Sequence, residues 1–246
     1  MEQIALDQGQ LLVNLFPEVQ HRAAELRVPR FLDRMKAGAR VLWDLYGAEL
    51  FTACPKWESD TARGWAAFAV SLIPAGLDQR LSLAREFADD HHFAVREWAW
   101  LGVRPAVVEA PKTTLSFLVP WVDDTSCRIR RFCSEVTRPK GVWSRHIVEL
   151  KAEPWLGLPI LSALSTAPER YVRDSVANWL NDVSATSGEW VEETCAEWET
   201  MHGDAVAYVC RRARRSLQTS PSRFRRACFS TRSFHVITSS PSRPTS

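Results

Sequence analysis

The sequence predicts an all-α protein, an α-solenoid of stacked HEAT-like helical repeats with a concave face. The first observation is a short motif, an apolar residue followed by Arg and a helical apolar pattern. It recurs at intervals of 33, 34, 43 and 38 residues, centred on Arg63, Arg96, Arg130, Arg173 and Arg211. Such intervals fit a pair of helices with two short turns. The second is composition, because 11 Trp against 10 Gly favour large side chains that fill gaps between helices.

Turns rich in Asp or Pro precede several of these motifs, as in "ADDHH", "VDDTS" and "STAPE". We expect these turns to supply helix N-caps and acidic residues in the first helical turn. A single helix pair cannot bury its apolar face alone, so neighbouring pairs must stack into a continuous array. Such stacking produces the concave face.

The chain divides into three regions by pattern. Residues 1–50 are helical and would cap the open end of the array, and residues 51–215 carry the repeats. Residues 216–246 contain nine Ser, five Arg and no acidic residue, which is typical of a disordered tail. Without that tail, residues 1–215 hold 26 basic and 29 acidic residues, a net charge of −3.

Several classes of protein are disfavoured. No apolar run approaches the roughly 18 residues of a membrane span, the N-terminus lacks the pattern of a secretory signal, and we expect a cytoplasmic protein. The six Cys form no C-x-x-C pair, which favours reduced thiols. "DDHH" (89–92) contains metal-ligand residue types, but no matching set recurs at helical spacing, and motifs for phosphate binding or acyl transfer are missing. We therefore expect no metal and no cofactor.

The segment "ERYVRDSVANWLNDVS" (169–184) predicts a helix with two different faces. At about 100° per residue, its buried stripe consists of Val172, Val176, Trp179, Leu180 and Val183. A polar line follows one edge of that stripe and consists of Tyr171, Ser175, Asn178 and Asp182. A neighbouring repeat would half cover this edge, so its side chains could be held rigidly and still meet a ligand.

The preceding repeat offers a counterpart in "CRIRRFCSEVTRPKGVW" (127–143). Its core side consists of Ile129, Phe132, Cys133 and Val136, and the adjoining edge of Arg128, Arg131, Glu135 and Arg138. If the two repeats stack in register, Glu135 and Asp182 point the same way and flank one groove, with Trp143 in the turn after the first helix. Residues 127–151 also hold seven Lys or Arg against two Glu, a strip that could follow a phosphate backbone.

Simpler interpretations stay open for each of these residues. Arg131 and Glu135 stand four residues apart, as in an ordinary surface ion pair. Asp182 and Asn178 could bond to nearby backbone. Trp143 taken alone is more typical of a core residue than of a ligand platform.

Together the two segments resemble a known family. "RRFCSEVTRPKGVW" and, after a helix, "ERYVRDSVANWLNDVS" are similar to the patterns S-E-x-x-R-P…W and Y-V-R-x-S-V-A-N-x-L-N-D of the HEAT-like-repeat DNA glycosylases of alkylation repair, the AlkC/AlkD group. The resemblance covers residues 50–215. Trp179 stands where the family often has His, and "VTRPKGVW" replaces "GTRPRLPW".

The resemblance implies hydrolysis of the N-glycosidic bond of cationic alkylated purines, such as 3-methyladenine or 7-methylguanine, in duplex DNA, without strand cleavage. Asp182 and Glu135 would stabilise the sugar cation and orient water, and Trp143 would press its ring on the damaged nucleotide. The implied contacts to DNA are made by Arg131, Arg138, Lys140, Arg145, Arg173 and Asn178. Two further residues could line the groove, Glu97 and Tyr171.

A second class of function also stays open, a non-catalytic HEAT-repeat scaffold that binds DNA or protein. The expected partner of the enzyme is duplex DNA containing alkylated bases, bound by a monomer. Because the body carries little net charge, we expect modest, salt-sensitive DNA affinity that depends on residues 127–151.

Overall fold

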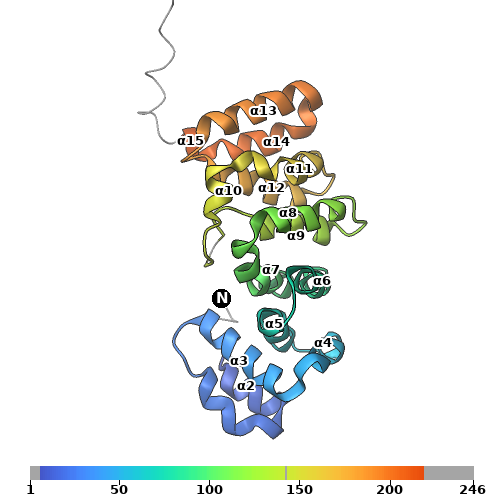
Figure 1. Ribbon diagram of the computed structural model, residues 1–246, viewed down its shortest axis with the longest axis vertical. Helices are drawn as coiled ribbons and strands as arrows, with labels where there is room; N and C mark the ends of the chain where they lie inside the picture. The colour runs from blue at the N-terminus through green and yellow to red at the C-terminus, as the bar shows by residue number, and fades with distance from the viewer. Residues whose placement is uncertain (1–5, 142, 219–246) are drawn as a thin grey trace, which may run out of the picture.

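The computed structural model describes residues 6–141 and 143–218, and every regular element in them is a helix (Figure 1). Most of the tail expected to be disordered, residues 219–246, lies outside the described residues. Its first residues, 216–218, belong to a short terminal helix. Among the described helices, none is both long and apolar enough to cross a bilayer.

The α-helices are, in chain order, α2 Gln8–Leu15, α3 Phe31–Tyr46, α4 Leu50–Ala53, α5 Asp60–Ala69, α6 Leu77–Ala88, α7 Phe93–Glu109, α8 Pro111–Leu118, α9 Cys127–Val136, α10 Val148–Ala152, α11 Leu158–Leu164, α12 Arg170–Val183, α13 Gly188–His202, α14 Asp204–Ala213 and α15 Arg215–Gln218. Short 3-10 segments join several of them, at Pro17–Leu26, Gly47–Glu49, Cys54–Lys56, Val70–Leu72, Val119–Trp121 and Pro154–Gly157.

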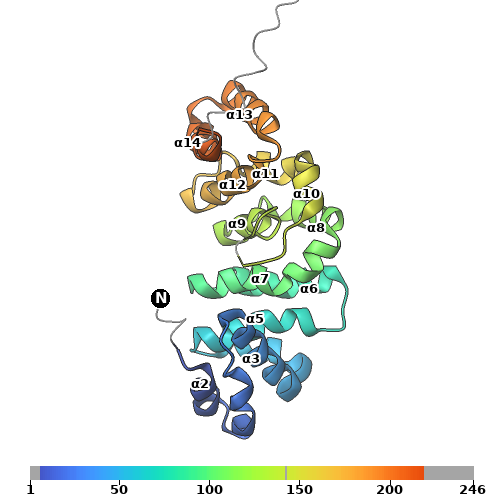
Figure 2. The same cartoon turned by 90° about the vertical axis from the view of Figure 1, so that its left-hand side faces the viewer.

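The helices form two layers along one long axis. In the first layer α3, α5, α7, α9, α12 and α14 each pack on the next, and this row faces the viewer in Figure 2. On the other side, α6 packs on α7, α11 on α12 and α13 on α14. The stack is curved, and its left-hand outline in Figure 1 is hollowed at the level of α7. The prediction of an all-α solenoid with a concave side is confirmed.

The repeated Arg has a structural explanation. In α5, α7, α9 and α12 it is the fourth residue of the helix, and its guanidinium reaches back over the turn that precedes the helix. The inclusion of Arg211 in the motif is wrong, because it is the eighth residue of α14. Arg63 Nη1, for example, donates to the carbonyls of Trp57 at 2.7 Å and Glu58 at 2.9 Å. The same bonds, to carbonyls five and six residues earlier, are made by Arg34, Arg96 and Arg130, and Arg173 makes the bond to the sixth. The motif therefore fixes how each helix begins.

The Asp side chains of these turns bond to backbone N–H groups within the turn and are not helix N-caps. Asp90 Oδ1 accepts from the backbone N–H of His92 at 2.7 Å, and Asp124 Oδ1 accepts from that of Ser126 at 2.8 Å. Of the three quoted turns only "VDDTS" supplies a cap, Ser126. The expectation of acidic first turns is wrong for α7, α9 and α12, whose first turns contain no acidic residue. In all three the Arg of the motif bonds to carbonyls of the preceding turn instead.

Residues before position 50 continue the stack. Helix α3 packs on α5, as α5 packs on α7, and Arg34 repeats the bonds of Arg63. The division after residue 50 falls at the first residue of α4, and the division after 215 falls inside α15. The N-terminal segment is therefore a further unit of the array as well as its end.

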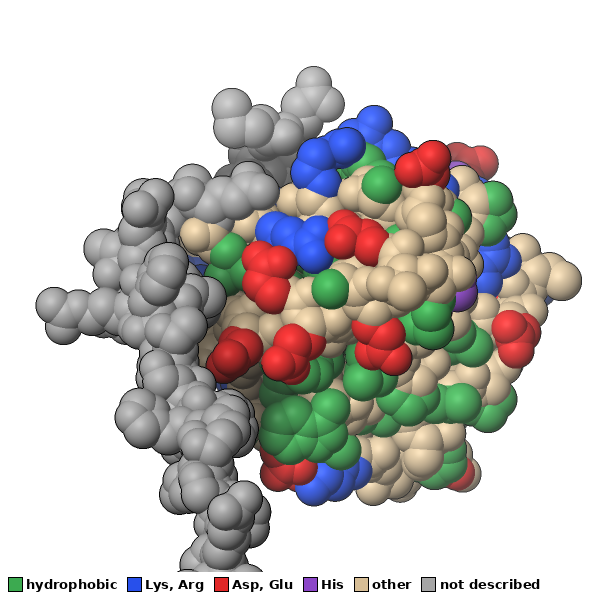
Figure 3. Space-filling view, turned by 90° about the horizontal axis from the view of Figure 1, so that it is seen from above, with side chains coloured by type: hydrophobic (Ala, Val, Ile, Leu, Met, Phe, Trp, Pro, Cys, Tyr) green, Lys and Arg blue, Asp and Glu red, His purple; other side chains and the backbone are tan. Residues whose placement is uncertain are grey.

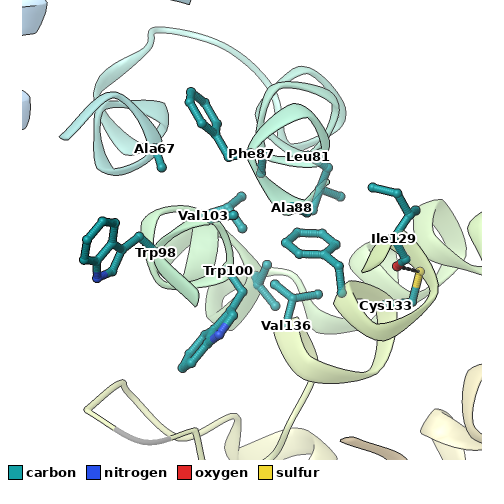
Figure 4. Close-up of a cluster of buried hydrophobic side chains, with 14 of the residues drawn as sticks. Ala67, Leu81, Phe87, Ala88, Trp98, Trp100, Val103, Ile129, Cys133 and Val136 are labelled. Carbon is teal, nitrogen blue, oxygen red and sulfur yellow. Dashed lines mark hydrogen bonds between the residues drawn. The ribbon is translucent and has the colours of Figure 1, made fainter. Parts of the chain in front are cut away.

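Large apolar side chains fill the space between the layers. Figure 4 shows one part of this core, in which Leu81 and Phe87 of α6, Val103 of α7 and Ile129 of α9 belong to one buried cluster, while Trp98 lies on the far side of α7. Helices α5 and α7 approach so closely that a Cβ on Gly102 would lie 2.2 Å from the carbonyl oxygen of Ala67. This packing holds the first-layer helices in register, which is what places their polar edges side by side.

Candidate functional site

Glu135 and Asp182, expected at the catalytic centre, share one guanidinium. Glu135 lies in the last turn of α9, Asp182 in the last turn of α12, and Arg138 follows α9. Arg138 donates from Nε to Asp182 Oδ2 at 2.9 Å and from Nη2 to Oδ1 at 3.1 Å. Its Nη1 donates to Glu135 Oε1 at 2.7 Å. Stacking of the two repeats therefore brings these carboxylates together.

The ion-pair network continues into the repeat before. Glu135 Oε2 accepts from Ser175 Oγ at 2.7 Å and lies 3.5 Å from Arg131 Nη2. The same Arg131 nitrogen lies 2.7 Å from Glu97 Oε1, and Glu97 Oε2 accepts from the indole of Trp100. Acidic and basic groups thus alternate from α7 through α9 to α12. This network consists of Glu97, Arg131, Glu135, Arg138 and Asp182.

Tyr171, a possible groove residue, lies beside this network. The guanidinium carbons of Arg96 and Arg131 lie 5.4 Å and 4.5 Å from the centre of its ring. Arg96 Nε also donates to the Tyr171 hydroxyl at 3.0 Å. The ring therefore supports Arg131, which in turn orients two carboxylates of the network.

The three carboxylates differ in how far a ligand can reach them. The Glu135 side chain is 4% exposed, that of Asp182 10% and that of Glu97 35%. Burial by itself would raise the pKa of Glu135, but Arg131 and Arg138 outweigh it, so the pKa is lowered. At Asp182 burial dominates and raises the pKa, despite hydrogen bonds from Arg138 and from the backbone of Lys140. Glu97, to which sequence reasoning gave a minor place, is the carboxylate most open to solvent.

Trp143 is not a core residue. Its side chain is 69% exposed, and its φ of 59° is the only positive value among the described non-glycine residues. A bulky residue in this region is strained, and such strain clusters at functional sites. Trp143 borders three hollows, of about 450, 160 and 630 Å³, and none of the three is lined by Glu97, Glu135 or Asp182. The hollows that border Trp143 are therefore separate from the three carboxylates.

Arg104 of α7 holds the segment that carries Arg138 and Trp143, and sequence reasoning missed it. The residue is 2% exposed, and its guanidinium donates to the backbone carbonyls of Val136, Arg138 and Arg145. Burial, with Arg138 nearby, lowers the pKa of Arg104 to about 10. The available signal was an Arg within the apolar stretch "WAWLGVRPAVV", because such a charge must find buried partners.

Few basic residues of the 127–151 strip remain available for phosphates. Lys140 and Arg145 are exposed, and within the described part of the chain no ion pair engages either side chain. Arg131 and Arg138 are held in the network, with side chains 14% and 12% exposed. The others also have partners: Arg128 meets Asp89, Arg130 meets Glu169, and Lys151 lies near His146.

The two remaining DNA-contact candidates on α12 are also engaged. Arg173 donates to the Ala167 carbonyl at 3.0 Å and lies 5.8 Å from the ring centre of Tyr208. Asn178 Oδ1 accepts from Arg215 of α15 at 3.0 Å. The departure from the family pattern at Trp179 affects packing, since this side chain is fully buried and donates to the Thr137 carbonyl at 3.1 Å.

Charge elsewhere on the surface limits where a polyanion can lie. The end of the stack formed by α13 and α14 shows a run of acidic side chains (Figure 3). In the "DDHH" turn, Asp90 binds Arg63 and His92 lies near Asp60. The described residues contain no group of three or more metal-ligand side chains placed to hold an ion.

Comparison with known proteins adds relatives at the level of sequence and of fold. No family model matches the chain. An uncharacterized protein of Bacillus subtilis (strain 168), YhaZ, is 35% identical over 100 residues, which are 41% of this chain and 28% of that protein. The match therefore spans little more than a quarter of the relative's length.

Similar solved structures include the following three. The alkylpurine DNA glycosylase AlkC of Pseudomonas fluorescens, solved bound to DNA containing an abasic site analog, superposes with a TM-score of 0.71 at 22% identity, over 88% of this chain and 62% of that one. AlkD2 of Streptococcus mutans gives 0.61 at 17% identity, over 80% and 95%. The protein smu.31 of Streptococcus mutans UA159 gives 0.63 at 18% identity, over 84% and 98%. The chain therefore has the helical-repeat fold of the AlkC and AlkD2 proteins.

Proposed function

We propose that this chain is a DNA glycosylase that hydrolyses the N-glycosidic bond of cationic alkylated purines in duplex DNA. The observation that carries the proposal is the network, in which three successive repeats contribute Glu97, Glu135 and Asp182, joined by two guanidiniums. The fold shared with a DNA-bound alkylpurine glycosylase supports DNA as the partner. We further propose that the protein acts as a monomer in the cytoplasm.

The chemistry of the lesion fits fixed carboxylates. In a base such as 7-methylguanine the ring already carries a positive charge, so the bond from C1′ to nitrogen breaks with its electron pair leaving on the base. The sugar becomes oxocarbenium-like, and a water adds to C1′ and loses a proton. Preorganised anions stabilise that developing cation, and a carboxylate can accept the proton of the water. A strong general acid is not required.

Within this proposal the side chains have separate roles. Glu97 and Asp182 are the carboxylates that reach the surface of the network, and they face the sugar and the water. Glu135, which is almost fully covered, positions Arg131 and Arg138 between them. Lys140 and Arg145 contact phosphates. None of the network's three carboxylates lines the hollows at Trp143, so its ring is assigned to a DNA contact away from the reacting sugar.

The test is release of free base. Duplex DNA containing 7-methylguanine is incubated with the protein under single-turnover conditions, and the released base is measured by chromatography. We expect Asp182→Asn and Glu97→Gln to slow release by about 100-fold or more, while Glu109→Gln, an exposed Glu at the end of the same helix α7, is unchanged.

The alternative class of function gives a different result. A non-catalytic scaffold would bind the duplex without releasing base above the spontaneous rate. If the wild-type protein behaves in this way, or if Asp182→Asn and Glu97→Gln release base at the wild-type rate, the network is not a catalytic centre.

A further inference from the structure

One hollow joins α3 to the segment after α9 and has the composition of a binding site. It has a volume of about 450 Å³ and is lined by Arg30, Phe31, Leu32, Asp33, Lys36 and Trp143. A second hollow of about 160 Å³ shares Leu32, Lys36 and Trp143 and extends to the buried Arg104. The 450 Å³ volume falls in the range of about 300–1,000 Å³ of small-ligand pockets.

The lining combines a π face, an apolar wall and positive charge. Trp143 presents its ring largely to solvent, and Phe31 and Leu32 supply the apolar wall opposite. Arg30 and Lys36 are exposed at the rim, with Asp33 as the single acid in the lining. A flat ring that carries an anionic group is the ligand chemistry that this combination recognises, because bases stack on aromatic side chains and phosphates attract Lys and Arg.

We propose that this hollow is a second nucleotide subsite, which holds one unpaired nucleotide of the bound DNA. The inference rests on the proposed function only in taking DNA as the partner. An ordinary base is neutral and its phosphate is anionic, so it fits a basic hollow better than the carboxylate network. A cationic alkylated base has the opposite preference. Charge therefore separates the two subsites, one for the lesion and one for a nucleotide that has lost its pairing partner.

The segment that carries Trp143 is held in place before any ligand binds. Arg104 fixes the segment on either side of Trp143 through the carbonyls of Arg138 and Arg145. Trp143 itself has a positive φ. Among the described residues, no ring contact involves its indole. A strained and exposed Trp on a rigid support is preorganised to stack on a partner, since little freedom is lost on binding.

The experiment compares two duplexes of identical sequence. In one, a 5-iododeoxyuridine pairs with adenine; in the other it stands opposite an abasic-site analogue and is unpaired. Dissociation constants are measured by fluorescence anisotropy, and irradiation followed by peptide mapping identifies the side chain that cross-links to the iodinated base. We expect the unpaired duplex to bind about 10-fold more tightly and to cross-link to Trp143.

Variants of the hollow test whether its residues cause the tighter binding of the unpaired duplex. Trp143→Ala and the double variant Arg30→Ala/Lys36→Ala are expected to remove the 10-fold difference between the two duplexes, and each is first checked for wild-type thermal unfolding. Arg40→Ala is the matched control, because Arg40 is exposed on the same helix and lines none of the three hollows. Equal binding of the two duplexes by the wild-type protein, or a cross-link mapped away from this hollow, would overturn the proposal.

The subsite and the glycosylase activity can fail separately. A preference for the unpaired duplex that Asp182→Asn retains, in a wild-type protein that releases no base, supports the subsite and rejects the activity. Base release by a wild-type protein that binds the two duplexes equally rejects the subsite and leaves the activity standing.

Discussion

Arg138 meets Asp182 edge to edge, with Nε 2.9 Å from Oδ2 and Nη2 3.1 Å from Oδ1. Two parallel charge-assisted hydrogen bonds of this kind set orientation as well as distance. Because the two residues are 44 positions apart, the pair ties the segment after α9 to the last turn of α12. The same contact therefore contributes to repeat stacking and to the geometry of the candidate site.

Removal of that guanidinium should destabilise the fold. In Arg138→Ala, Asp182 loses both bonds and Glu135 loses one, which leaves charges with little solvent around them. We expect the free energy of unfolding in urea to fall by about 3 kcal/mol. Arg170→Ala is the control, because its side chain is 71% exposed and lies 3.7 Å from Asp174; that change should cost less than about 1 kcal/mol. Equal losses in the two variants would contradict the argument.

Arg104 should control the segment around Trp143. In Arg104→Met the carbonyls of Val136, Arg138 and Arg145 lose their donor, so we expect trypsin to cleave after Lys140 and Arg145 at least about 10-fold faster, as local opening becomes easier. Cleavage is followed by mass spectrometry under native conditions.

The control for that experiment removes a comparable contact elsewhere. Arg80 Nη2 donates to the Ile73 carbonyl at 3.0 Å, and Arg80→Met should leave the rate of cleavage after Lys140 and Arg145 unchanged. If both variants accelerate cleavage equally, Arg104 stabilises the protein as a whole and has no particular hold on this segment.

Periodicity predicts the parts of this structure that depend on one helix at a time. The buried stripe of α12, which includes Val176, Trp179 and Leu180, is fully buried as expected, and the core side of α9 is also correct. The reason is that a helix with one apolar edge has a single way to pack. The recurring Arg likewise indicates the repeats, although its bonds to the preceding turn are visible only in the structure.

Helical periodicity does not predict contacts that involve loops or helices buried on most sides. Arg138 lies just after α9, so no helical angle relates it to Asp182. Helix α7 is buried on most sides, so its hydrophobic pattern shows that Arg104 must have buried partners but does not show which carbonyls it bonds to. Trp143 is exposed in a backbone conformation that a bulky residue rarely adopts, and only the residue taken alone would be expected in the core.

Acid should lower the rate of base release. The pKa of Asp182 is raised by burial, so its protonated form appears at a higher pH than that of an ordinary Asp. If the ionised form supports the reaction, the rate of base release is highest at neutral pH and falls as the pH drops through the raised pKa of Asp182. The measurement is single-turnover release of 7-methylguanine, corrected for spontaneous release, between about pH 4 and pH 8.

Unfolding should not account for that loss. The pKa of Glu135 is lowered in the fold, so its contribution to stability is present above its ordinary pKa and is lost only as the pH falls through the lowered value. Asp182 has the opposite shift, so the folded state takes up its proton more readily than the unfolded state does. Circular dichroism should therefore show folded protein where the rate has already declined. A rate that rises on acidification would mean that protonated Asp182 is the active form.

Arg173 and Lys140 should behave in opposite ways, although both are candidates for DNA contact. Arg173 makes the repeat bond to the preceding turn, so Arg173→Ala should lower the free energy of unfolding by about 1 kcal/mol and leave DNA affinity unchanged. Lys140 is exposed, so Lys140→Ala should leave stability unchanged and weaken binding. The plot of log affinity against log salt concentration has a negative slope, and its magnitude should decrease by about 1 in Lys140→Ala, because one phosphate contact is lost. In Arg173→Ala the slope should not change. A reduced slope in Arg173→Ala would instead place this arginine on the DNA, and the repeat bond would then not be its main role.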